Sequence, residues 1–265
     1  MEDIIEQNFG KAFAIAWNEN QGSYSASVAH NTLRFIKLQK LNIETVLDVC
    51  CGSANFLKVM AADGKKCTGT EILDSYIEYD RAKYPEMTFV KTNSILDFDN
   101  LGKFDLISCN HDMINLLPTI EQWSEFFQKA YNHLNNGGLL ILDYYTKKRL
   151  QHWNELTYDE NEKLDFIKRI SSDGVRSTTI TSTFYVNLDP NPDKNIPEFE
   201  KNNRYKRAED SVIEYYFENE AILNELKKAG YRYLITADGN FSPVSNLSDM
   251  NRMHIIAIKR EVARQ

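Results

Sequence analysis

The chain has 265 residues, enough to bury a substantial core in one large domain or in one domain with a sizeable insertion. Hydrophobic residues make up 42% of it and aromatic residues 12%, fractions typical of a folded globular protein and not of a disordered one. The 38 acidic and 31 basic residues give a net charge of -7, and the basic residues form only short runs, which argues against nucleic acid as a partner.

The four cysteines, at positions 50, 51, 67 and 109, lack the paired spacing of a zinc site, so we predict no metal centre. Three of them lie in or beside apolar strand-like runs, which indicates small buried side chains. The N-terminal sequence has no apolar signal region, and no apolar run approaches the roughly 18 residues that a membrane span needs. We therefore expect a cytoplasmic protein without a membrane partner.

Apolar residues at helical spacing predict a helix from Asp3 to Asn18 and a second from about Ser25 to Gln39, separated by turn-forming residues. Residues 1–42 are thus interpreted as a helical cap in front of the first strand.

Between residues 43 and 150, short apolar strands alternate with amphipathic helices. This alternation is typical of a doubly wound α/β fold, whose parallel sheet is covered on both faces. The predicted strands are Thr45 to Cys50, Lys66 to Thr70, Met87 to Lys91, Phe104 to Asn110 and Gly138 to Tyr144, and the predicted helices are Asn55 to Ala62, Leu73 to Lys83 and Ile120 to Leu134.

The pattern changes over residues 151–217, where β-branched residues predominate. Strands are predicted from Leu164 to Ile170 and from Val175 to Val186, joined at an Asp-Gly pair that is a strong hairpin signal. A loop over residues 188–203 and a third strand, about Tyr205 to Phe217, complete a predicted antiparallel sheet inserted into the α/β core.

Residues 218–265 are expected to return to the core. Glu218 to Ala229 is an amphipathic helix with Gly230 as its C-cap, and it is followed by strands from Tyr231 to Ala237 and from Met253 to Lys259. We predict that these two strands form a hairpin that finishes the main sheet.

The stretch from Thr45 to Phe56 runs from a strand through a tight turn of small residues into a helix, which aims backbone N–H groups at the negative end of a ligand. A dinucleotide-binding turn would need glycine at three positions that here hold Cys50, Gly52 and Asn55. Only one is glycine, which disfavours an NAD(P)-dependent oxidoreductase.

The same turn resembles the first motif of the class I S-adenosylmethionine-dependent methyltransferases, D-x-G-x-G-x-G. Asp48 and Gly52 match it, and Cys50 and Ala54 are small substitutes for glycine. Glu71 ends the second strand 19 residues after Gly52, close to the spacing at which a carboxylate accepts hydrogen bonds from ribose hydroxyls. The resemblance implies S-adenosylmethionine as cofactor.

Further positions follow from this resemblance. Ile72 would lie against the adenine, and Asn93, with Ser94 and Ile95 beside it, stands where the family commonly has an acidic residue that bonds the adenine amino group. The Asn93 amide oxygen can accept that bond, although Asn93 is also an ordinary turn residue. Tyr24 is expected to close over the cofactor.

The strand that begins Phe104-Asp105-Leu106-Ile107 and ends at Asn110 looks like that of small-molecule methyltransferases related to the sugar and glycine N-methyltransferases. The resemblance implies a mostly parallel seven-stranded sheet, made of residues 43–150 and 218–265, that binds the cofactor. It places the inserted sheet on the side of the acceptor. Asn110 joins the candidate cofactor residues.

His111 and Tyr144 are the candidate catalytic residues. An imidazole can deprotonate an amine or hydroxyl near neutral pH, but His111 is also explained as a histidine at a helix start. Tyr144 leaves an apolar strand, so it either lines the acceptor site or belongs to the core. In sugar methyltransferases a histidine lies a few residues further on, where this chain has Leu116.

We predict a methyltransferase that moves a methyl group from S-adenosylmethionine to N or O of a small metabolite, as a monomer or homodimer. The substitutions at Cys50, Ala54 and Asn93 leave open a second interpretation, a non-catalytic module that binds S-adenosylmethionine or a metabolite.

Overall fold

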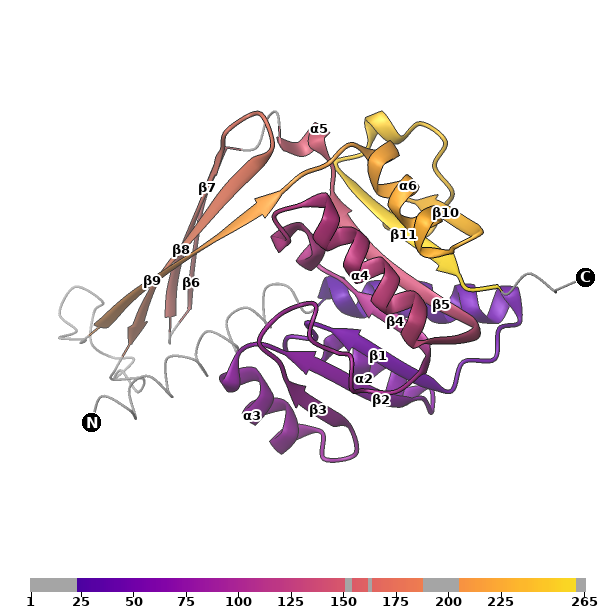
Figure 1. Ribbon diagram of the computed structural model, residues 1–265. Helices are drawn as coiled ribbons and strands as arrows, with labels where there is room; N and C mark the ends of the chain where they lie inside the picture. Colours follow the sequence, from indigo (N-terminus) through magenta and orange to yellow (C-terminus); the bar gives the residue numbers. More distant parts are fainter. Residues whose placement is uncertain (1–22, 151–153, 162–163, 188–204, 261–265) are drawn as a thin grey trace, which may run out of the picture.

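The computed structural model describes residues 23–150, 154–161, 164–187 and 205–260. It is built on a seven-stranded sheet in the order β10-β11-β5-β4-β1-β2-β3 (Figure 1). In this order, each strand from β5 to β3 is parallel to the next, whereas β11 runs antiparallel to both β5 and β10. The strands are β1 (Thr45–Val49), β2 (Lys66–Glu71), β3 (Thr88–Lys91), β4 (Phe104–Cys109), β5 (Leu134–Tyr145), β10 (Tyr233–Ala237) and β11 (Arg252–Ile258). The doubly wound fold and the closing hairpin are confirmed.

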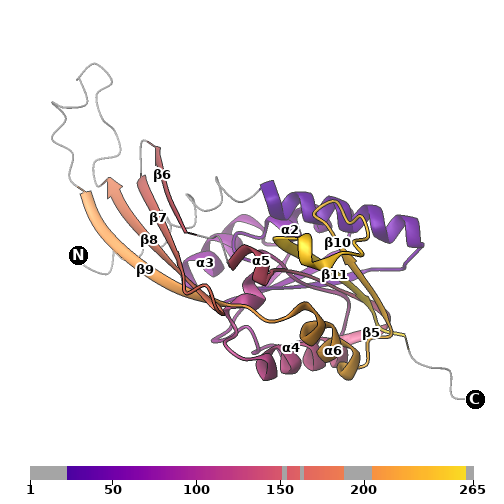
Figure 2. The same ribbon diagram turned by 90° about the horizontal axis from the view of Figure 1, so that it is seen from above.

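Helices cover both faces of this sheet (Figure 2). One face carries α4 (Ile120–His133) and α6 (Asn219–Ala229), and the other carries α2 (Asn55–Ala62), α3 (Asp74–Lys83) and the helix over residues 23–39. The helix α4 buries Trp123, Phe126, Phe127 and Ala130, the spacing of one helical face. Two hydrophobic cores result, one on each side of the sheet.

Strand β5 starts four residues earlier than predicted, at Leu134 instead of Gly138. The sequence Asn135-Asn136-Gly137-Gly138 belongs to the strand, which passes an irregularity in the β4–β5 register here. Gly137 has a φ of 82° at this point, a conformation that glycine adopts without strain. The other predicted ends in the main sheet differ by one or two residues.

The inserted sheet is antiparallel, as predicted, in the order β6-β7-β8-β9. Its strands are β6 (Glu155–Asn161), β7 (Leu164–Ser172), β8 (Ser177–Asn187) and β9 (Tyr205–Tyr215). The prediction of three strands missed β6, whose polar sequence ELTYDEN lacks a strand signal. The Asp-Gly hairpin is confirmed, and the Asp173 carboxylate accepts the N–H groups of Val175, Arg176 and Ser177.

One buried side chain joins the inserted sheet to the main sheet. Asn115 lies in a short 3-10 helix, η1 (Met113–Leu116), and its Nδ2 donates to the carbonyls of Tyr145 and Tyr215. Its Oδ1 accepts the N–H of Tyr145. Beside it, Leu150, Ile170 and Tyr216 form a small core. The end of β9 is therefore fixed against the end of β5.

Two of the predicted segments cannot be compared with the structure. The helix from Asp3 to Asn18 and the loop over residues 188–203 lie outside the described residues. Within the described part of the chain, no helix has the length and apolar character to cross a membrane.

The helix α3 carries a buried carboxyl group that no hydrogen bond compensates. Asp80 is 0% exposed, and neither of its side-chain oxygens has a hydrogen-bond partner in the part of the chain that the structure describes. Burial raises the pKa of Asp80 to about 8, and the nearby Glu71 adds to this effect. The folded protein therefore holds a proton here at neutral pH, whereas the unfolded chain releases it near pH ~4.

This difference predicts that the free energy of unfolding falls as the pH rises from about 4 to about 8, by at most about 1.4 kcal/mol per pH unit, because only the unfolded state loses the proton. Asp80→Asn should remove this component of the slope. Urea denaturation at several pH values measures it. Asp74→Asn, at an exposed position of the same helix, is the matched control, and an equal slope in both variants would contradict the assignment.

Candidate cofactor and acceptor site

The turn after β1 has an unusual backbone. Cys50, Gly52 and Ala54 all take left-handed conformations, with φ of 59°, 54° and 55°. Cysteine and alanine therefore occupy the conformations for which the motif has glycine, at a cost of about 1–2 kcal/mol each. A Cβ atom on Gly52 would meet no atom within 4 Å, so the space in front of the turn is open.

Glu71, at the end of β2, fixes this turn. Its carboxylate accepts the N–H of Gly52 at 3.0 Å and the N–H groups of Ile72 and Leu73 at 2.6 and 2.9 Å. Burial raises the pKa of Glu71, and these three amide contacts oppose that shift. The structure brings Glu71 and Gly52 together, as predicted from their spacing, while Ile72 is half-buried beside them.

Polar side chains from β1 and β4 meet next to the turn. Asp48 is buried and accepts the hydroxyl of Ser108 at 2.6 Å and the amide Nδ2 of Asn110 at 3.5 Å. Burial raises the pKa of Asp48 to about 7. The Oδ1 atom of Asn110 is buried without a partner in the described structure. A buried acceptor of this kind calls for a donor, which a ligand can supply.

The segment after β3 is less informative. Asn93 and Ser94 are exposed, and they contact their own loop through the Asn93 N–H to Asp97 and the Leu96 N–H to the Ser94 hydroxyl. Ile95 is buried in the hydrophobic core of the α4 side. Their adenine contacts stay predictions.

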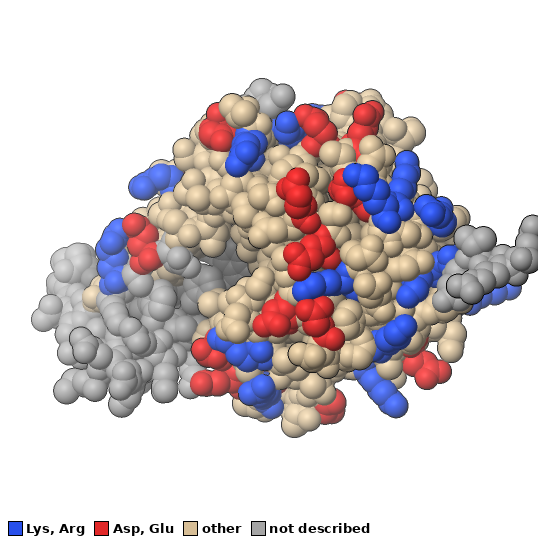
Figure 3. Space-filling model, viewed as in Figure 1, with Lys and Arg blue, Asp and Glu red and all other residues tan. Residues whose placement is uncertain are grey.

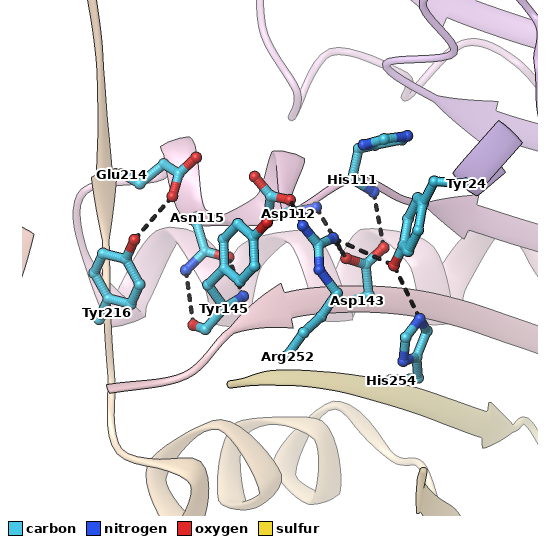
Figure 4. A network of polar contacts seen from close by, with 10 residues as sticks. All are labelled: Tyr24, His111, Asp112, Asn115, Asp143, Tyr145, Glu214, Tyr216, Arg252 and His254. Carbon is cyan, nitrogen blue, oxygen red and sulfur yellow. Dashed lines mark hydrogen bonds and ion pairs between the residues drawn. The ribbon is translucent and has the colours of Figure 1, made fainter. Parts of the chain in front are cut away.

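Two of the predicted candidates, Tyr24 and His111, form a network with several residues that were not predicted, at the carboxyl ends of β4 and β5 (Figure 4). Tyr24 reaches it from the helix over residues 23–39, and its ring lies edge-on to His111 with centroids 4.5 Å apart. Its hydroxyl group is 3.0 Å from Nε2 of His254 and accepts a bond from Arg252 at 3.3 Å.

Arg252, the first residue of β11, is the cation of this network. It forms ion pairs with Asp112 and Asp143 and lies over the ring of Tyr145, 3.9 Å from its centroid. Burial alone would raise the pKa of Asp143, but the charge of Arg252 holds it below its ordinary value.

Asp143 also fixes the chain that leaves β4. Its carboxylate accepts the N–H groups of His111 and Asp112 at 2.8 and 3.1 Å. These two residues are left-handed, with φ of 60° and 52°. The sequence analysis did not predict Asp143 or Arg252. A carboxylate inside the apolar strand β5 is unusual, and this signal could have indicated Asp143.

Tyr144 lies in the core, the second of the two positions considered for it from the sequence. It is 0% exposed, packs edge-on against Trp123, and donates its hydroxyl to Asn219. Because side chains alternate along a strand, its neighbour Tyr145 faces the network instead.

Comparison with known proteins decides the family. A family model described as a methyltransferase domain matches residues 19–235, most of the chain. The chain belongs to this methyltransferase family. The prediction made from the turn, Glu71 and the fourth strand is confirmed at this level.

Curated relatives match part of the chain. A dTDP-4-amino-2,3,4,6-tetradeoxy-D-glucose N,N-dimethyltransferase of Saccharopolyspora spinosa is 25% identical over 118 residues, 44% of this chain. The chain spans about half the length of the two curated relatives it matches, 47% and 55%.

Solved structures share the fold over nearly the whole chain. An S-adenosylmethionine-dependent methyltransferase from Clostridium acetobutylicum has a TM-score of 0.76 at 16% identity, over 94% of this chain and 98% of that one. The sugar N-methyltransferase KedS8 from Streptoalloteichus has a TM-score of 0.72 at 16% identity, over 93% and 92%. The amino pentose methyltransferase CalS10 from Micromonospora echinaspora, solved with S-adenosylmethionine bound, has a TM-score of 0.69 at 17% identity, over 92% and 96%.

The network predicts a large stability loss when its cation is removed. Arg252→Met should lower the free energy of unfolding by about 3–5 kcal/mol at neutral pH, because it leaves the buried Asp143 carboxylate without its counter-charge. Urea denaturation measures the loss. Arg232→Met, at an exposed position, is the control and should cost less than about 0.5 kcal/mol. A similar small cost for both variants would show that the ion pair does not stabilise the fold.

Proposed function

We propose that this protein is an S-adenosylmethionine-dependent methyltransferase that acts on a nitrogen or oxygen atom of a small molecule. The observation that carries the proposal is the turn after β1, in which Cys50, Gly52 and Ala54 keep the left-handed backbone while the space before Gly52 stays open. The substitutions at positions 50 and 54 thus leave the turn geometry intact, which weakens the interpretation as a non-catalytic module.

The residues present fit this cofactor. The turn at Gly52 and the carboxylate of Glu71 would hold its ribose part, with Ile72 and Asn93 toward the adenine. Asp48 and the unpartnered Oδ1 of Asn110 offer acceptors to its ammonium group. The cofactor supplies an electrophilic methyl group on a sulfonium, so the protein has mainly to align the acceptor and exclude water.

The acceptor would bind at the network of Figure 4, between the main sheet and the inserted sheet of residues 151–217. Acidic and basic side chains are interspersed on the face seen in Figure 3. The names of two proteins described above, the Saccharopolyspora spinosa dimethyltransferase and CalS10, specify amino sugars, which favours a sugar-like amine. Tyr24 and His111 are close enough to one another to bound the site from the side of the cap.

Isothermal titration calorimetry with S-adenosylhomocysteine tests the proposal. The wild-type protein should bind it and not NAD or NADP, and Gly52→Arg should abolish binding by filling the open space. Gly102→Arg is the matched control, since Gly102 is also left-handed and open but precedes β4 at the opposite edge of the sheet.

Absence of binding to the wild-type protein would refute the proposal. Binding without any methylated product across a panel of amines, sugars and phenols would instead favour the non-catalytic module.

A further inference from the structure

A buried histidine joins the last strand of the main sheet to the helix over residues 23–39. His254, in β11, is 1% exposed, and the strand register places it beside Asp143 of β5. The ring of Phe241 lies against the imidazole, with centroids 5.7 Å apart. Nε2 of His254 lies 3.0 Å from the hydroxyl of Tyr24, which comes from the helix (Figure 4). The sheet and Phe241 therefore fix the imidazole that Tyr24 meets.

The hydrogen bonds of the Tyr24 hydroxyl determine which nitrogen of His254 carries a hydrogen. Arg252 donates to this hydroxyl at 3.3 Å, and a guanidinium can only donate, so the bond occupies a lone pair of the oxygen. The hydroxyl hydrogen is then available for Nε2 of His254, the other polar atom that contacts it in the described structure. Nε2 must lack a hydrogen to accept this bond. A neutral ring that meets the condition carries its hydrogen on Nδ1.

The other forms of the ring leave more buried groups without partners. Nδ1 of His254 makes no hydrogen bond within the described structure. With the hydrogen on Nδ1, that N–H is the one unsatisfied group of the pair. With the hydrogen on Nε2, both the Nδ1 lone pair and the Tyr24 hydrogen lack a partner, and each such group costs free energy. The count therefore favours the hydrogen on Nδ1.

A neutral ring also suits the charges around it. Burial lowers the pKa of His254. The carboxylates of Asp143 and Asp238 favour the charged ring, whereas Arg252 opposes it. At neutral pH the ring is therefore uncharged, and Nε2 remains an acceptor.

Tyr24 carries this contact to the proposed cofactor site. Its ring lies edge-on to His111, 4.5 Å between centroids, and the guanidinium of Arg252 lies 4.8 Å from the centre of the same ring. His111 follows β4, and its own N–H is held by Asp143 at 2.8 Å. With its hydroxyl fixed by two hydrogen bonds, the Tyr24 ring keeps its orientation toward His111.

We propose that His254 is a positioning residue of the cofactor site: its Nε2 accepts the Tyr24 hydroxyl and thereby holds the Tyr24 ring beside His111, where the ring covers the cofactor. This inference rests on the proposed function and adds to it a residue that acts on the cofactor through another side chain. A hydrogen on Nε2 would turn the acceptor into a donor and release the hydroxyl.

The first experiment identifies the tautomer in the full chain without cofactor. Nuclear magnetic resonance of protein with nitrogen-labelled histidines shows which ring nitrogen carries a hydrogen, and the signals that His254→Gln removes belong to His254. At pH 7.5 the expected result is a hydrogen on Nδ1 and none on Nε2. Tyr24→Phe removes the donor and should shift the Nε2 signal of His254.

The second experiment is a double-mutant cycle on the affinity for S-adenosylhomocysteine, measured by titration calorimetry at pH 7.5. His254→Leu removes the acceptor and should weaken binding by about 3- to 10-fold, the effect of one ordinary hydrogen bond. Tyr24→Phe should weaken binding at least as much, because it also loses the bond from Arg252. Adding His254→Leu to Tyr24→Phe should cause no further loss, since the two residues act through one contact.

Two further variants separate this role from a general effect of losing a histidine. His254→Gln should keep an affinity close to that of the wild type, because its amide oxygen can accept the same bond. His30→Leu, at an exposed position of the helix over residues 23–39, is the control and should bind like the wild type.

The outcomes distinguish the two proposals. A hydrogen on Nε2 of His254, an unchanged affinity of His254→Leu, or additive losses in the double variant would each overturn the positioning role and leave the proposed function standing. Failure of the wild-type protein to bind S-adenosylhomocysteine would refute the proposed function, and the positioning role with it.

Discussion

The ion pair between Asp143 and Arg252 is the interaction on which the carboxyl edge of the sheet depends. Asp143 is fully buried in β5, and without a counter-charge its ionised form would cost several kcal/mol. Arg252 supplies that charge from β11, so the antiparallel hairpin that ends the fold is coupled to the parallel strands. The register that pairs Met253 with Tyr144 brings the two groups to the same edge.

Along this edge, a buried carboxylate holds a left-handed segment of backbone at two places. Glu71 accepts the N–H of the left-handed Gly52, and Asp143 accepts the N–H groups of the left-handed His111 and Asp112. In each case a buried carboxylate on the neighbouring strand accepts hydrogen bonds from backbone N–H groups. The left-handed backbone turns these N–H groups away from the sheet. Left-handed non-glycine residues persist only where the surroundings hold them, as Asp143 does for His111 and Asp112. The edge therefore presents two fixed turns, one facing the proposed cofactor and one facing the proposed acceptor.

Much of this architecture was predictable from the sequence, because strand and helix periodicity is local. Asp48, Gly52 and Glu71 were found for the same reason, since a turn and the end of the next strand have a characteristic spacing. The Asp143–Arg252 pair joins residues 109 positions apart and leaves no periodic signal. Tyr144 and Tyr145 differ only in which face of β5 they occupy, and both faces of this strand are buried, so no alternation of polar and apolar residues distinguishes them. The strand β6 was missed because its polar residues form a strand only through pairing with β7.

The two sheets differ in how strongly stability constrains their buried carboxyl groups. The turn after β1 and the Asp143–Arg252 pair belong to the main sheet, where a change disturbs buried charges and threatens the fold. Glu214 belongs to the inserted sheet, and in its protonated form it makes neutral hydrogen bonds that glutamine could largely reproduce. Its identity is therefore less constrained by stability than that of Asp143. A buried carboxyl group of this kind can change without unfolding the protein, so the inserted sheet is freer to vary in sequence than the edge that holds the two turns.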